Sequence, residues 1–151
     1  MPPAGPGCGM VRLGLVVAAF DKADDAEPLP VRMAERARDA ARERGAEVVT
    51  ERRVPGSYDT PLAADRLARR EDVDAVAVVG AIVTGDTDHD QVIADAAARG
   101  LTQVSLDRDT PVTLGITGPG MSRAEAEERV EYGAQAVRSA IDTVEELEGE
   151  S

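Results

Sequence analysis

Apolar residues gather in four short blocks along the chain, and each block is typical of a buried β-strand. The blocks cover residues 11–18, 47–54, 73–83 and 111–117. The third, which reads VDAVAVVGAIV, is the most continuous. A run of Val, Ile and Ala without a polar face fits the centre of a parallel sheet that is covered on both sides. We therefore expect four strands, with the third in a central position.

Segments with helical spacing separate these blocks. A helix is expected over 29–44, where Val31, Ala34, Ala37 and Ala41 recur at three- and four-residue intervals. The turn at 55–61 leads into a second helix with Pro61 in its first turn. A third helix is expected over 88–98, with a break at Gly100. Ser122 and Glu125 have capping-box spacing and predict one long last helix, whose apolar stripe is Ala126, Val130, Gly133, Val137, Ile141 and Val144.

Strands that alternate with helices predict a parallel sheet with right-handed crossovers. The expected architecture is a flavodoxin-like three-layer α/β/α sandwich, with four parallel strands in the order 2-1-3-4. At 151 residues the chain fits one domain. That domain is expected over 10–151, after a disordered extension at 1–9 that is rich in Pro and Gly.

Charge and composition narrow the classes of function. The formal net charge is -12, and Lys22 is the only lysine. Such a surface repels nucleic acid and anionic membranes and suits concentrated salt, although an ordinary acidic cytosolic protein has a similar balance. No apolar run approaches the roughly 20 residues of a membrane span, and no secretory signal is recognisable, so we expect a cytoplasmic protein. Cys8 is the only cysteine and predicts neither a disulfide nor a metal pair.

Unusual residues follow the ends of the predicted strands, where parallel sheets bind ligands. The segment Gly85-Asp86-Thr87 joins a strand to a helix start, and its amides fit a phosphate, although a ligand-free helix cap has the same sequence. His89, the only histidine, suits acid/base chemistry. The alternative for His89 is a solvated surface side chain.

Three further residues have both a functional and a structural interpretation. Arg129, about two turns into the expected last helix, suits phosphate binding, or else an ion pair with Glu125. Phe20 suits stacking on a planar ring, or else packing against a neighbour. Asp59 suits hydrogen bonding to a polyol, or else acts as a charge at a helix N-terminus.

In combination, five segments resemble the 6,7-dimethyl-8-ribityllumazine synthase family, in its archaeal-type branch. They are Ala19-Phe20, VPGSYDTP at 54–61, GAIVTGDTDH at 80–89, PVTLGIT at 111–117 and Glu128-Arg129. The resemblance implies a condensation of 5-amino-6-(D-ribitylamino)uracil with 3,4-dihydroxy-2-butanone 4-phosphate. The products are the lumazine, phosphate and water, and the reaction is a step of riboflavin biosynthesis without metal or organic cofactor.

The resemblance also implies a role for each matching residue. Phe20 stacks on the pyrimidine. The phosphate is held by Arg129 with Gly85, Asp86 and Thr87, and His89 moves protons. The ribityl chain and the uracil are held by Ser57, Tyr58, Asp59, Ala81, Ile82 and Val83, the last three mainly through backbone.

The chain departs from the family pattern at three places. Many members have Glu where Asp59 stands, Phe where Leu114 stands, and a lysine in the last helix, where Arg138 is a candidate replacement. The family forms pentamers, often twelve in an icosahedral shell of 60 subunits, and Leu114 is expected to cover the neighbouring subunit's pocket. Two alternatives remain: an archaeal-type riboflavin synthase, and a non-catalytic flavodoxin-like binding or shell protein.

Overall fold

Four parallel strands form the sheet of this protein, in the order β2-β1-β3-β4. The computed structural model describes residues 10–19, 29–83 and 89–148. The strands are β1 Arg12–Ala18, β2 Glu47–Val54, β3 Ala75–Val83 and β4 Val112–Met121, and every adjacent pair is parallel. The predicted strand order is confirmed. The expected extension at 1–9 lies outside the described residues.

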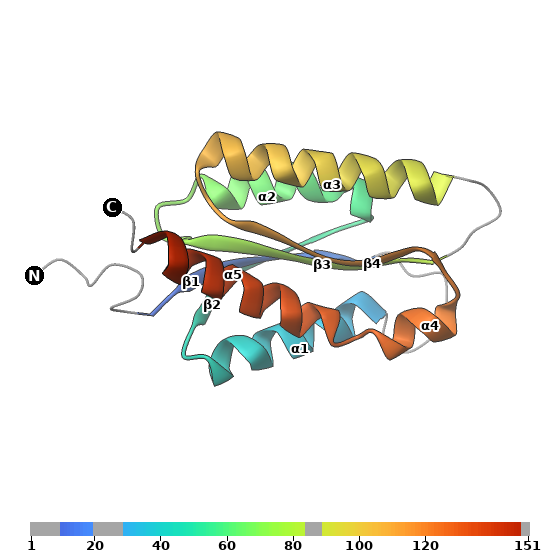
Figure 1. The fold of residues 1–151 in the computed structure, drawn as a ribbon, viewed down its shortest axis with the longest axis horizontal. Helices are drawn as coiled ribbons and strands as arrows, with labels where there is room; N and C mark the ends of the chain where they lie inside the picture. The colour runs from blue at the N-terminus through green and yellow to red at the C-terminus, as the bar shows by residue number, and fades with distance from the viewer. Residues whose placement is uncertain (1–9, 20–28, 84–88, 149–151) are drawn as a thin grey trace, which may run out of the picture.

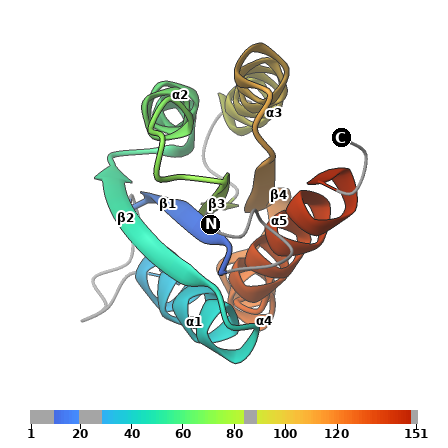
Figure 2. The same ribbon diagram turned by 90° about the vertical axis from the view of Figure 1, so that its left-hand side faces the viewer.

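Helices cover both faces of the sheet, as the predicted three-layer sandwich requires (Figure 1). The helices are α1 Leu29–Glu43, α2 Thr60–Ala68, α3 His89–Arg108, α4 Arg123–Glu128 and α5 Tyr132–Glu148. Seen along the strands, α2 and α3 lie on one side of the sheet and α1, α4 and α5 on the other (Figure 2). None of the helices, within the described ranges, is long and apolar enough to cross a membrane.

Alternation along the central strands divides the core into two clusters. Leu13, Leu15 and Val17 of β1 face α1 and α5, whereas Val16 faces α2 and α3. Since successive side chains of a strand point to opposite faces, a strand covered on both sides must be apolar at every position. This explains why β1 and β3 were recognisable from sequence as continuous apolar runs.

The third helix corrects one sequence prediction. Instead of breaking at Gly100, α3 continues to Arg108 and is 20 residues long. Gly100 faces Pro61 at the start of α2, where a Cβ would lie 2.7 Å and 2.9 Å from two carbons of the proline ring. The glycine therefore permits a close helix–helix approach and does not end the helix.

The C-terminal region corrects a second prediction from the sequence. The predicted single last helix is two helices, α4 and α5, with a turn at residues 129–131 between them. The capping box is confirmed: the Ser122 amide donates to Glu125 Oε1 (3.1 Å), and the Glu125 amide donates to Ser122 Oγ (3.2 Å). It opens α4, a helix of only six residues.

The fourth strand is also longer than expected, since β4 continues past residue 117 to Met121. Gly118 has a φ of 98°, and a Cβ there would lie 2.1 Å from the carbonyl oxygen of Ile82. The glycine thus lets β4 stay beside β3 where their register shifts, between Ala81 and Val83. The predicted strand ended at residue 117, before the Gly-Pro-Gly sequence at 118–120, which is part of β4.

Candidate active site

A short 3-10 helix, Ser57–Asp59, joins β2 to α2 and carries three of the predicted site residues. The Asp59 carboxylate accepts a hydrogen bond from the Gly56 amide (3.1 Å). The hydroxyl of Thr60, which is fully buried, donates to the Ser57 carbonyl (2.8 Å). Ser57 is buried, whereas Tyr58 is 64% exposed. These local bonds fix the turn and leave the Tyr58 ring on the surface.

Asp59 precedes the first residue of α2 but makes no side-chain hydrogen bond to that helix. Its carboxylate instead closes the turn behind it, through Gly56. Asp59 therefore stands at the N-terminus of α2, as the structural interpretation expected, but its carboxylate bonds to Gly56 and not to the helix. The carboxylate stabilises the turn that presents Ser57 and Tyr58.

The ends of β1 and β3 meet this turn at Gly80. A Cβ at Gly80 would lie 2.9 Å from the Cβ of Ala18 and 3.4 Å from Ser57 Oγ. Any larger residue at position 80 would force these elements apart. Ala81 and Ile82, the next residues of β3, therefore lie beside the Ser57 turn at the carboxyl edge of the sheet.

His89 is the first residue of α3, and its side chain is exposed. The predicted helix began at residue 88, so the position of His89 at the start of the helix agrees with the expectation. Phe20, Gly85, Asp86 and Thr87 lie outside the described residues, and Val83 is described by its backbone alone.

Arg129 lies in the turn between α4 and α5, not within a helix, and its side chain is exposed. Its carbonyl accepts a hydrogen bond from the Tyr132 amide (2.9 Å). The pKa of Glu125 is lowered mainly by hydrogen bonds from the backbone and side chain of Ser122, and the charge of Arg129 lowers it further. Glu125 and Arg129 are thus electrostatic neighbours.

Leu114 is not part of this edge of its own chain. It pairs with Val78 in the middle of β4, three residues before Thr117, and is 53% exposed. Three residues of strand span about 10 Å. An exposed leucine on an edge strand is available to another molecule, whereas this chain's own site lies further along the sheet.

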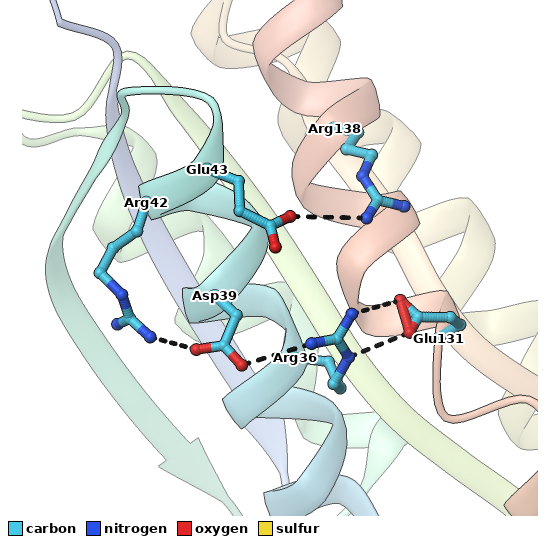
Figure 3. Close-up of polar contacts among 6 residues, drawn as sticks. All are labelled: Arg36, Asp39, Arg42, Glu43, Glu131 and Arg138. Carbon is cyan, nitrogen blue, oxygen red and sulfur yellow. Dashed lines mark hydrogen bonds and ion pairs between the residues drawn. The ribbon is translucent and has the colours of Figure 1, made fainter.

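Arg138 pairs with Glu43 in the last turn of α1, at an Nη2–Oε1 distance of 4.0 Å (Figure 3). Because α1 ends just before β2 begins, Glu43 belongs to the amino-edge half of the domain. This partner gives Arg138 a structural role between α1 and α5. It does not support Arg138 as a replacement for the family's lysine.

Sequence reasoning missed a basic groove beside Asp59. The groove has a volume of about 490 Å³, and four arginines line it against one carboxylate, that of Asp59. In so acidic a chain the pairs Arg52-Arg53 and Arg69-Arg70 were a signal of a local basic surface. Only the folded chain brings β2 and α2 together around the groove. The arginines of the groove are Arg52, Arg53, Arg66 and Arg70.

The family model for 6,7-dimethyl-8-ribityllumazine synthase matches residues 10–148. This chain belongs to that family. A lumazine synthase of Halorubrum lacusprofundi is 67% identical over 92% of this chain and 100% of its own length. One from Halobacterium salinarum is 62% identical over 91% of this chain and 100% of its own length. One from Methanopyrus kandleri is 47% identical over 93% of this chain and 98% of its own length.

Membership of the lumazine synthase family decides the reaction. The chain is a lumazine synthase that condenses the ribitylaminouracil with the butanone phosphate, releasing phosphate and water. Neither the riboflavin synthase alternative nor the non-catalytic alternative is favoured by these relatives.

Proposed function

We propose that the carboxyl edge of the sheet binds both substrates of the lumazine synthase reaction, one on each side of the end of β3. The observation that carries this proposal is the close approach at Gly80, which joins the ends of β1 and β3 to the Ser57 turn. A pyrimidine with its ribityl chain fits along these three elements. Ser57, Tyr58 and Asp59 hold the ribityl chain, and Ala81, Ile82 and Val83 hold the uracil through backbone groups. Phe20 stacks on the ring.

The phosphate substrate lies on the other side of the end of β3, between Arg129 and the start of α3. A net charge of -12 disfavours a phosphate dianion at long range, so its binding needs a local cation. Arg129 supplies that charge, and Gly85, Asp86 and Thr87 supply amides and a hydroxyl. His89 moves protons during imine formation, phosphate elimination and ring closure. Holding two substrates in one orientation contributes much of the remaining rate.

The assembly is proposed to be a homo-oligomer, a pentamer or a shell of 60 subunits, in which Leu114 covers the site of its neighbour. Its half-exposed position on an edge strand, away from its own site, supports this arrangement. The chain is further proposed to act in a cytoplasm of high salt. The chain has 29 acidic and 17 basic residues, and this acidic excess supports that setting.

The test of the proposed site is a kinetic comparison of Arg129→Ala with the parent chain. Losing a charged hydrogen bond should raise KM for the butanone phosphate about ten- to hundredfold. KM for the pyrimidine should stay within twofold of the parent, about the precision of the comparison. Arg69→Ala is the matched control: it removes an exposed arginine at the end of α2, where Arg69 pairs with Asp65. Equal losses for both substrates in Arg129→Ala would contradict the phosphate role.

A further inference from the structure

Two contacts tie the turn that carries Arg129 to helix α1. The first is steric, at Gly133 in the first turn of α5. A Cβ on Gly133 would lie 2.3 Å from the carbonyl oxygen of Met33, so the two helix backbones touch at this point. The second contact is ionic and lies at the other end of the same short segment, at Glu131.

Glu131 forms a two-pronged ion pair with Arg36 of α1 (Figure 3). Arg36 Nε donates to Glu131 Oε2 (3.0 Å), and Arg36 Nη2 donates to Glu131 Oε1 (2.9 Å). The pKa of Glu131 is lowered, first by the hydrogen bond from Arg36. A fork of this kind fixes direction as well as distance, because both guanidinium bonds must align with the carboxylate plane.

The position of this pair in the backbone distinguishes it from the ion pairs that α5 makes with Glu43 of α1 and with Arg44, which follows α1. Glu131 lies in the interruption between two helices, two residues after Arg129. In this segment the Tyr132 amide donates to the Arg129 carbonyl (2.9 Å), the Gly133 amide to the Val130 carbonyl (3.3 Å) and the Gln135 amide to the Glu131 carbonyl (3.0 Å). The first two bonds join residues three apart and close a turn, whereas regular α-helical bonds join residues four apart. By contrast, Asp142 pairs with Arg44 from the middle of α5, where the helix itself holds the backbone.

We propose that Arg36 and Glu131 are positioning residues for Arg129, and that they act on the binding of the phosphate substrate. The inference rests on the proposed role of Arg129. The fork fixes the turn against α1, and the turn sets the direction in which the Arg129 side chain leaves the backbone. Without the fork, Arg129 samples more orientations, and the phosphate must select the productive one.

The decisive variant is Glu131→Gln, because electrostatics alone predicts the opposite result. Removing a carboxylate near a phosphate site should by itself lower KM for the phosphate substrate. If the fork positions Arg129, Glu131→Gln instead raises that KM, by about two- to fivefold for a half-exposed pair. KM for the pyrimidine stays at the parent value.

Asp142→Asn is the matched control. It makes the same change of charge within α5, away from the turn, and breaks the pair with Arg44, but it should leave KM for both substrates unchanged. Arg36→Gln removes the other partner of the fork. In the double variant with Glu131→Gln, KM should equal that of Arg36→Gln alone, since one interaction cannot be lost twice.

The outcomes separate the two proposals. If Arg129→Ala raises KM for the phosphate substrate and Glu131→Gln leaves it unchanged or lowers it, the positioning proposal is overturned and the role of Arg129 stands. An equal rise in Asp142→Asn also overturns it, because a general loss of α1–α5 packing would then be the cause. If Arg129→Ala itself leaves that KM unchanged, the proposed role of Arg129 fails, and the positioning proposal fails with it.

Discussion

Replacing Gly100 with alanine should destabilise this protein, although alanine is the better helix former. In the middle of a helix, Gly→Ala normally gains about 1 kcal/mol. Here the new Cβ would lie 2.7 Å and 2.9 Å from two carbons of the Pro61 ring. The ring is rigid and begins α2, so relief requires movement of a helix. Overpacking of this kind costs about 1–3 kcal/mol, and we expect a net loss of about 1 kcal/mol.

Urea unfolding followed by far-ultraviolet circular dichroism measures this change, and Pro61→Gly provides the control background. Pro61→Gly removes both ring carbons that the new Cβ would meet. In that background Gly100→Ala should stabilise the chain by about 1 kcal/mol, the ordinary helix effect. The sign of the alanine effect thus depends on Pro61. If Gly100→Ala stabilises the parent chain as much as the Pro61→Gly variant, the close approach of α2 and α3 does not explain the glycine.

Three further predictions concern stability. Ser122→Ala removes the capping bond to the Glu125 amide and should lower the free energy of unfolding by about 1 kcal/mol in urea; no change would show that α4 needs no cap. Raising sodium chloride from about 0.1 M to about 2 M should raise the melting temperature, because salt screens the repulsion of a -12 chain; a falling melting temperature would contradict this. Asp65 and Glu131 have lowered pKa values, chiefly through hydrogen bonds from Arg108 and Arg36. Their stabilisation is complete above the unfolded-state pKa values and is lost as pH falls through the lower folded-state values, so unfolding free energy should fall below about pH 4. An unfolding free energy that stays constant below about pH 4 would refute this prediction.

Periodicity was sufficient for the sheet because its strands are buried on both faces. After Arg12 at the start of β1, the runs in β1 and β3 have no polar position, so neither their type nor their central place depended on distant contacts. Strand order then followed from the handedness of the crossovers. The two glycine errors have the opposite origin. Gly100 is required by the close approach of Pro61, and Gly118 by that of Ile82. Both contacts form only in the folded chain.

The candidate site was predictable as a set of residue types at one edge, but its geometry was not. Ser57 and Gly80 are far apart in sequence and come within contact distance only because β2 and β3 both flank β1. Arg129 was expected on a continuous helix because the capping box at Ser122 and Glu125 and the apolar stripe from Ala126 to Val144 predict a single helix. The interruption follows from tertiary contacts, in which Gly133 packs against Met33 of α1. The fork from Arg36 to Glu131 joins residues 95 positions apart, which no local pattern signals.

The most direct test of the central claim mixes the purified chain, in high salt, with 5-amino-6-(D-ribitylamino)uracil and 3,4-dihydroxy-2-butanone 4-phosphate. Absorbance follows the lumazine, and a separate assay follows free phosphate. A lumazine synthase should release both products in equal amounts and well above the uncatalysed rate. No product above that background, or conversion of added lumazine to riboflavin, would contradict the account.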